Sequence, residues 1–302
     1  MKNLKITTSQ IAKICNVSQG TVDRALNGRS DIKAETKQKI LEVAKQYGYR
    51  DYVHTQTDEI AEQIGIIVFN LNNEYFSELI TEVEYALRKL KLGATVMMSH
   101  YDKQYEIECI RNLYNMGVKG IILCSINNGA EFENYLDLFD IPIVAVGNRV
   151  KSLPYVGIDD FVAMKEMSTK ILNDNPQNII YFSPALNYSD AYAQRLRYEG
   201  FLSAVGNAKY SVVTDIDDIK EYYDEKTTII CSNDYYALQV YFRTSNVKVV
   251  GFDNIKALNK YKIPIDSVGY SMAEIANAAV DIVKCNGKDS VIVKHFIAKH
   301  TV

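Results

Sequence analysis

The feature that most constrains the fold is a series of short apolar runs that recurs from residue 64 onward. They are rich in Val and Ile and read IGIIVF, ATVMM, GIILC, IPIVAV, NIIYF, TTIIC and VKVVGF. Most are separated by segments long enough for amphipathic helices, over residues 76–91, 104–116, 160–173, 190–205 and 233–243. Buried β-branched strands that alternate with helices are typical of a parallel sheet with helices on both faces. The pattern therefore predicts an α/β fold.

The length of this part predicts two lobes. Residues 64–302 are more than one sheet usually carries, so we expect two similar α/β lobes. Ligands of such lobes bind in the crevice at the carboxyl ends of the parallel strands.

The first fifty residues have a different texture and predict three short helices, over residues 7–16, 19–26 and 34–47. Their start and stop signals are Thr7 with Gln10, Asn16, Ser18, Asn27 with Gly28, and Gly48. The residues predicted to be buried are Ile11, Ala12 and Ile14 in the first helix and Ile40, Val43, Ala44 and Tyr47 in the third. Two helices joined by a short turn, with a third packed across them, form a helix-turn-helix. The same pattern also fits a structural three-helix bundle that binds nothing.

The charge distribution separates the two parts of the chain. Residues 1–50 hold ten Lys or Arg and four Asp or Glu, whereas the rest hold 24 and 33. A basic head on an acidic body is typical of a nucleic-acid-binding domain tethered to a second domain.

Composition excludes several other classes of protein. No apolar run approaches the roughly 18 residues that a membrane span needs. The first residues have no continuous apolar run and no small-residue cleavage site, so we expect no secretion signal. The five cysteines are far apart and form no C-x-x-C pair, which predicts reduced core thiols in a cytoplasmic protein.

Catalytic signatures are absent from the sequence. There is no phosphate-binding loop, nucleophile elbow or dinucleotide fingerprint, and the four histidines lack metal-ligand spacing. The acidic group Asp215, Asp217 and Asp218 is interpreted as a solvated loop. We therefore expect no catalytic residue, no metal site and no cofactor.

The second predicted helix carries the residues expected to read DNA. In a helix-turn-helix this helix lies in the major groove, so Gln19, Gly20 and Arg24 would face the base edges. Gln pairs bidentately with adenine and Arg with guanine, each contributing about 1–3 kcal/mol of discrimination. The full predicted DNA-binding set is Thr8, Ser9, Ser18, Gln19, Gly20, Thr21, Asp23, Arg24, Asn27, Lys33 and Thr36.

The stretch TTSQIAKICNVSQGTVDRALNGRSDI resembles the DNA-binding domain of the LacI/GalR family of bacterial transcription regulators. The residues on the family's positions are Ala12, Val17, Ser18, Thr21, Val22, Arg24 and Asn27. The resemblance continues through IGIIVFNLNNEYFSELITEVEYAL, GVKGIILC, IPIVAVGNR, SDAYAQRLRYEGFLSAV, CSNDYYALQVYF and VVGFDN. It covers nearly the whole chain, about residues 5–300.

This resemblance implies a domain organisation. It implies a helix-turn-helix domain over 1–50, an atypical hinge over 51–63, and a two-lobed, periplasmic-binding-protein-like domain over 64–302. Lobe 1 is expected at about 64–157 and 271–286, and lobe 2 at about 158–268 and 287–302. Three crossovers would link the lobes, an effector would bind between them, and two copies of the chain would form a homodimer.

The resemblance also implies which residues contact the effector. Arg197 matches the family arginine that clamps ligand oxygens, and Asn233 and Asp253 match the A-N-D and G-F-D motifs. Asn73, Tyr75 and Phe76 follow the first strand, where the family places other cleft residues. A five-donor guanidinium, an amide and a carboxylate suit a sugar or related polyol.

Two departures concern the head. Asp23 stands where the family usually has a serine that contacts a phosphate. It either accepts from a cytosine or orients a cation such as Arg29, or it tempers DNA binding through repulsion. Lys33 replaces a helix-capping serine, which loses a cap and adds a phosphate-seeking charge.

A third departure is the hinge. The family's Y-x-P-N-x-x-A-R-x-L is replaced by YRDYVHTQTDEIAEQ, with acidic Asp58, Glu59 and Glu62. With no leucine to wedge into the minor groove, little or no kink of the DNA is predicted.

The leading hypothesis is therefore a sequence-specific transcriptional regulator, acting as a repressor on a pseudo-palindromic operator and controlled by a carbohydrate effector. A sugar-binding sensor with weak or non-specific DNA binding is the alternative, and an enzyme ranks third.

Overall fold

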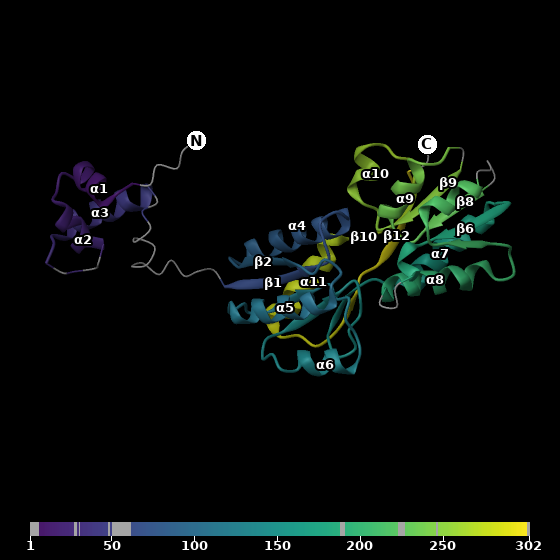
Figure 1. The fold of residues 1–302 in the computed structure, drawn as a ribbon, viewed down its shortest axis with the longest axis horizontal. Helices are drawn as coiled ribbons and strands as arrows, with labels where there is room; N and C mark the ends of the chain where they lie inside the picture. Colours follow the sequence, from purple (N-terminus) through teal and green to yellow (C-terminus); the bar gives the residue numbers. More distant parts are fainter. Residues whose placement is uncertain are drawn as a thin grey trace. The chain divides into compact units, whose positions relative to one another are not determined.

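The computed structural model describes residues 6–26, 29, 31–47, 49, 62–187, 191–222, 227–245 and 247–300. The chain divides into two compact units, one within the first 61 residues and one from Glu62 onward (Figure 1). We call them the head and the body. Predictions on the hinge residues 51–61, and on Asn27, Gly28 and Gly48, lie outside the described residues.

The described residues of the head form three helices whose caps follow the local sequence. The helices are α1 (Thr8–Cys15), α2 (Gln19–Leu26) and α3 (Ala34–Gln46). Thr7 and Gln10 form the predicted capping box, and Asn16 ends α1 in the left-handed conformation with φ 56°. The Thr21 backbone N–H donates to Ser18 Oγ at 3.1 Å, so Ser18 caps α2. Lys33 precedes α3 without a side-chain cap, as predicted.

Two predicted core positions in the head are wrong. Ile14 is 47% exposed and Cys15 is buried in its place, because the buried face of α1 is centred between Ile11, Ala12 and Cys15. Tyr47 is 51% exposed at the C-cap of α3.

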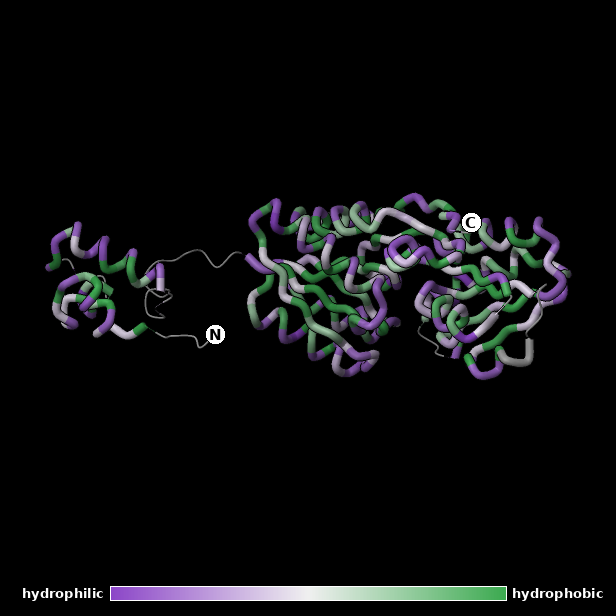
Figure 2. Tube along the Cα trace, turned by 90° about the horizontal axis from the view of Figure 1, so that it is seen from above, coloured by the Kyte–Doolittle hydropathy of each residue, from purple (hydrophilic) through white to green (hydrophobic). Residues whose placement is uncertain are grey.

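The first lobe of the body is built on a parallel six-stranded sheet. In spatial order its strands are β11 (Val291–Ile292), β5 (Tyr155–Gly157), β4 (Ile143–Val146), β3 (Ile121–Leu123), β1 (Gln63–Val68) and β2 (Gly93–Met98). Helices α4 (Glu74–Lys89) and α11 (Met272–Cys285) cover one face, and α5 (Lys103–Asn115) and α6 (Ala130–Leu136) cover the other. Apolar residues are concentrated in the strands, between the more polar helices (Figure 2).

The second lobe repeats this architecture with one antiparallel strand. Its order is β12 (His295–Ala298), β10 (Asp266–Tyr270), β9 (Lys248–Phe252), β8 (Thr227–Cys231), β6 (Asn178–Phe182) and β7 (Ser211–Val213). All neighbours are parallel except β10 and β12, so the expectation of parallel sheets holds for all but this pair. The covering helices are α7 (Asp160–Asn173) and α8 (Tyr192–Val205) on one face, and α9 (Asp234–Tyr241) and α10 (Lys256–Lys260) on the other.

The close packing of α7 on α8 requires a glycine at position 200. A Cβ on Gly200 would lie 2.3 Å from the Phe161 carbonyl oxygen, a contact that backbone atoms do not tolerate. Short 3₁₀ turns, η2 (Pro184–Asn187) and η3 (Ile216–Tyr222), connect elements of this lobe.

Of the five cysteines, four are buried, as expected of core thiols. Cys285, at the end of α11, is exposed, so the expectation is wrong for this residue.

The chain passes between the two sheets three times. It leaves the first after β5, returns between β10 and α11, and crosses again between β11 and β12. The expectation that all of residues 287–302 belong to lobe 2 is wrong for the first part of this segment. β11 pairs with β5 in the first sheet, and the Tyr155 N–H donates to Ser290 Oγ at 3.0 Å. The first lobe therefore extends through β11.

Candidate effector cleft and DNA-binding surface

The predicted DNA-binding residues lie on the outside of the head. Ser9, Ser18, Gln19, Gly20, Asp23, Arg24 and Lys33 are exposed, and Thr8, Thr21 and Thr36 are half-buried. The eleventh predicted residue, Asn27, is outside the described part of the chain.

The start of α2 is tied to the start of α1 through side chains. Gln19 Nε2 donates to Thr8 Oγ1 at 2.9 Å, and the hydroxyls of Ser18 and Thr21 are 2.8 Å apart. These contacts hold the polar residues of the first turn of α2 together on one exposed surface.

Arg24 is already paired in this structure. Its Nε donates to the Gly20 carbonyl at 3.1 Å, and its Nη1 lies 3.2 Å from Asp31 Oδ2. Asp31 has no recognisable signal in the sequence, where Arg29 is the cation expected beside the acid Asp23. Because the Arg24–Asp31 pair is exposed, it contributes little stability and can exchange for another anion.

A cavity of about 500 Å³ in the body is lined by residues of both lobes. All six predicted effector residues line it: Asn73, Tyr75, Phe76, Arg197, Asn233 and Asp253. The remaining lining residues include Phe69, Asn70, Asn72, Tyr101, Lys103, Cys124, Ile126, Val146, Gly147, Asn148, Gln194, Tyr235 and Tyr236. We call this cavity the cleft.

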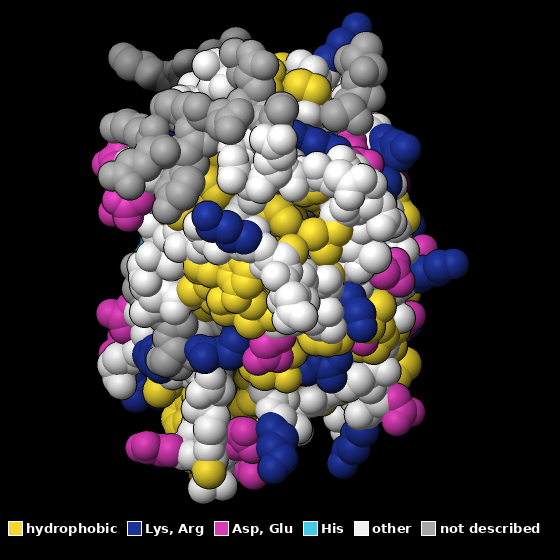
Figure 3. Space-filling view, turned by 90° about the vertical axis from the view of Figure 1, so that its right-hand side faces the viewer, with side chains coloured by type: hydrophobic (Ala, Val, Ile, Leu, Met, Phe, Trp, Pro, Cys, Tyr) yellow, Lys and Arg dark blue, Asp and Glu magenta, His cyan; other side chains and the backbone are white. Residues whose placement is uncertain are grey.

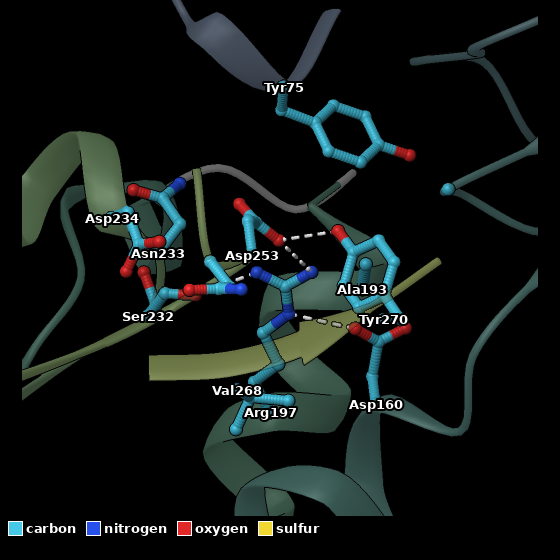
Figure 4. Close-up of polar contacts among 12 residues, drawn as sticks. Tyr75, Asp160, Ala193, Arg197, Ser232, Asn233, Asp234, Asp253, Val268 and Tyr270 are labelled. Carbon is cyan, nitrogen blue, oxygen red and sulfur yellow. Dashed lines mark hydrogen bonds and ion pairs between the residues drawn. The ribbon is translucent and has the colours of Figure 1, made fainter. Parts of the chain in front are cut away.

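Arg197 forms the floor of the cleft and is 7% exposed. Its Nε donates to Asp160 Oδ1 at 2.8 Å, its Nη1 donates to the Ser232 carbonyl at 2.8 Å, and its Nη2 lies 3.3 Å from Asp253 Oδ1 (Figure 4). The guanidinium carbon lies 3.7 Å from the centre of the Phe252 ring. Burial alone would lower the pKa of Arg197, but the two carboxylates outweigh burial and raise it.

Asp253 is held toward the cleft by a strained backbone. Its φ of 103° is rare for a residue with a side chain, and its N–H donates to the Val268 carbonyl at 2.8 Å. The Tyr270 hydroxyl donates to Oδ1 at 2.9 Å. The other carboxylate oxygen turns away from Arg197 and Tyr270 (Figure 4). Burial raises the pKa of Asp253 to about 6, against the opposing effect of Arg197.

Asp234 holds the segment that carries Asp253. This buried carboxylate accepts the Ile255 N–H at 3.0 Å and the Ser267 hydroxyl at 2.8 Å. It packs directly on Gly251, where an added Cβ would lie 1.9 Å from its Oδ1. Burial raises the pKa of Asp234 well above its ordinary value.

Two asparagines combine helix capping with a place in the cleft. Asn73 Oδ1 accepts the Tyr75 N–H at 3.1 Å and caps α4, and Asn233 Oδ1 accepts the Tyr236 N–H at 2.9 Å and caps α9. With the amide oxygen used by the cap, the NH₂ group of each side chain is left to donate to a ligand.

Aromatic rings line the cleft on both sides. In the first lobe, Phe69 packs against Phe76 and against Tyr101, each with ring centres 5.0 Å apart. In the second lobe, Tyr235 and Tyr236 pack edge to face at 5.6 Å. Such rings offer flat apolar faces to the C–H groups of a small ring ligand.

The cleft residues missed from the sequence share one signal. Asn70, Tyr101, Asn148 and Tyr235 each follow a parallel strand within a few residues, at its carboxyl end. Asp160 and Tyr270 lack a motif of their own and are recognised through their contacts with Arg197 and Asp253.

Direct ties join the two lobes beside the cleft. Asn148 Nδ2 donates to the Ser125 carbonyl at 2.9 Å, and its Oδ1 accepts the Ala193 N–H of α8 at 3.1 Å. Lys256 Nζ of α10 lies 3.1 Å from Glu78 Oε1 and 3.7 Å from Glu82 Oε1 of α4.

Figure 3 views one end of the second lobe, and the described side chains on that face form no concentrated patch of charge. On that end of the second lobe, basic and acidic side chains are dispersed around apolar areas.

Among the described residues, no group of His, Cys, Asp or Glu could hold a metal ion. None of the helices formed by them is long and apolar enough to cross a bilayer.

Two family descriptions match the chain. "Bacterial regulatory proteins, lacI family" matches residues 7–51, and "Periplasmic binding proteins and sugar binding domain of LacI family" matches residues 61–251. The chain is 23% identical to catabolite control protein A of Priestia megaterium over 302 residues, which cover 92% of this chain and 91% of that protein.

Solved structures share the fold. The complex of the transcriptional regulator CelR with cellobiose aligns with a TM-score of 0.65 at 16% identity and covers 99% of this chain and 100% of that one. The lac repressor dimer bound to operator and the anti-inducer ONPF aligns with a TM-score of 0.69 at 14% identity, with 98% of each chain covered.

Proposed function

The chain belongs to the LacI family of bacterial regulatory proteins, and from this membership we propose that it is an effector-controlled transcriptional repressor. Proteins of this family are DNA-binding regulators and not enzymes, so the cleft is a receptor site. Its effector is a sugar or related polyol, and its target is a two-fold symmetric operator bound by a homodimer in the cytoplasm.

The observation that carries the proposal is the gathering of six distant residues in one cleft. Arg197, Asn233 and Asp253 come from the second lobe, and Asn73, Tyr75 and Phe76 come from the first. A ligand that contacts both sets binds the closed arrangement of the lobes more tightly than an open one. The ligand therefore shifts the equilibrium toward the closed lobes, to an extent set by the difference between its affinities for the closed and the open arrangement.

The head supports the DNA-binding half of the proposal. Ser18, Gln19 and Gly20 are exposed at the start of α2, where a helix-turn-helix meets base edges. The complex of CelR with cellobiose is a precedent for a sugar ligand. The lac repressor dimer bound to operator is a precedent for two copies of the chain on one DNA site.

DNA selection and footprinting test the proposal. The full chain is used to select sites from a genomic library, and a protected two-fold symmetric site is expected that a binding sugar releases. Replacing Gln19 and Arg24 together with alanine is expected to remove the sequence preference, because each side chain contributes about 1–3 kcal/mol of discrimination. Gln46→Ala, exposed at the end of α3, is the control. An unchanged preference in the double variant would contradict the proposal.

A sensor with weak, non-specific DNA binding is the second candidate, and the pairing of Arg24 with Asp31 favours it. Together with Asp23 on α2, this acid places negative charge beside the residue expected to contact guanine. A salt titration separates the two functions. A repressor keeps its preference for the selected site over random DNA as salt rises, whereas a sensor binds both equally and weakly.

A further inference from the structure

The floor of the cleft carries more negative than positive charge although an arginine lies at its centre. Arg197 is ion-paired with Asp160 at 2.8 Å and with Asp253 at 3.3 Å, and all three side chains are buried. A third interaction of the guanidinium goes to the Ser232 carbonyl. With both carboxylates ionised, the three side chains sum to one negative charge. Arg197 therefore offers hydrogen-bond donors to a ligand, but no net positive charge.

The helix N-termini at the cleft do not supply positive charge either. The first turns of α4 and α9 each lose an N–H to the capping asparagine, Asn73 or Asn233. Each of these turns also contains an acid, Glu74 in α4 and Asp234 in α9. One N–H of each first turn is therefore already used by its cap, and an acid within the same turn lowers the positive potential that an anion would meet there.

The second cation among the described lining residues is Lys103. It is exposed at the first position of α5, whereas Arg197 lies on the buried floor. A charge in contact with water is screened and discriminates weakly between ligands.

The polar groups that face the cavity fit hydroxyls. Asp253 offers a carboxylate oxygen turned away from Arg197 and Tyr270, and Asn233 offers its NH₂ group (Figure 4). Tyr75 lies opposite Asp253 and brings an aromatic ring. A hydroxyl can donate to the carboxylate and accept from the amide, whereas a phosphate oxygen can only accept.

Resting on the proposed function, we propose that the effector is an uncharged polyhydroxylated ring and that the cleft excludes the phosphate esters of sugars. Asp160 and Asp253 are the specificity-determining residues. They neutralise Arg197 and leave the floor repulsive to a phosphate, whose desolvated charge would find only the exposed Lys103 and a buried arginine that is already paired.

Calorimetric titration of the full chain with matched ligands tests the inference. The probes are glucose, fructose, ribose and cellobiose, followed by glucose 6-phosphate, fructose 6-phosphate and ribose 5-phosphate. The expected result is a neutral sugar that binds about tenfold or more tightly than its own ester.

A pair of variants tests the assigned cause. Asp160→Asn keeps an oxygen for Arg197 Nε but removes one negative charge, so the preference for the neutral sugar is expected to shrink by about tenfold through tighter binding of the ester. Asp159→Asn is the matched control, because it makes the same charge change at an exposed neighbour, and asparagine can still cap α7.

Each outcome decides between the two proposals. An ester that binds wild type at least as tightly as its neutral sugar overturns this inference and leaves a carbohydrate-controlled regulator standing. Failure of every sugar and every ester to bind overturns the carbohydrate effector itself. If Asp160→Asn folds poorly, the comparison of ligands on wild type still decides whether phosphate esters are excluded.

Discussion

Asp253 is a buried acid in a rare backbone conformation, and burial of its carboxyl links the stability of the body to pH. Its pKa is raised from an ordinary value of 3.8 to about 6, mainly by burial. The folded state therefore holds the proton more tightly than the unfolded state. Its contribution to stability is greatest below pH 3.8 and is lost as the pH rises through about 6.

We expect Asp253→Asn to remove this loss, because asparagine resembles the protonated carboxyl. The difference in unfolding free energy between the variant and wild type should therefore change by about 1.4 kcal/mol in favour of the variant when the pH is raised from about 5 to about 8. Urea unfolding of the body at both pH values measures the difference. The exposed Asp159→Asn should show no such gain, and parallel pH profiles for wild type and Asp253→Asn would contradict the assignment.

A second residue-level prediction concerns Asp31. Replacing it with asparagine should change the stability of the head by less than about 1 kcal/mol, because the Arg24–Asp31 pair is exposed. Affinity for DNA should rise by about threefold or more, because a negative charge is removed and Arg24 is released. Fluorescence anisotropy at fixed salt measures the affinity, with Glu42→Gln on α3 as the charge-matched control. Equal gains in both variants would show that only net charge matters.

Residues within motifs were predictable, whereas residues that act through contacts were not. Arg197, Asn233 and Asp253 could be located from local sequence. Asp160 and Asp31 could not, because an ion pair between residues far apart in sequence depends on how the helices pack.

At the scale of elements, the N-cap of α9 joins stability to ligand binding, and the two roles can be separated. Asn233→Ser keeps a capping oxygen, so stability should stay within about 0.5 kcal/mol, whereas Asn233→Ala should lose about 1 kcal/mol. Both variants lack the NH₂ group, so both should bind the effector weakly. Thermal unfolding and calorimetry measure the two effects. If Asn233→Ser bound the effector as tightly as wild type, the NH₂ group of Asn233 would not be a contact of the effector.

Of the twelve strands in the described residues, the apolar runs located seven and missed five. Each predicted run contains a strand, from β1 at IGIIVF to β9 at VKVVGF. The missed strands β7, β11 and β12 lie at sheet edges, where exposed residues interrupt an apolar run. The interior strands β5 and β10 were also missed, because β5 is three residues long and β10 contains the buried polar Asp266 and Ser267.

At the scale of the whole body, the tie from Lys256 to Glu78 and Glu82 should favour closed lobes. Lys256→Gln is expected to weaken effector binding by about two- to fivefold at low salt, because the lysine is exposed. The difference should shrink at about 0.5 M salt, where charges are screened. Calorimetry at both salt concentrations measures it, and Lys260→Gln on the same helix is the control. A difference that persists at high salt would show that the ion pair is not the cause.

The last crossovers fix the order in which the body can be completed during translation. The first sheet lacks its edge strand β11, and α4 lacks its neighbour α11, until the ribosome has passed every strand of the second sheet except β12. The nascent first lobe therefore waits with an uncovered apolar face while the second is synthesised, and this interval is when a chaperone would be needed most.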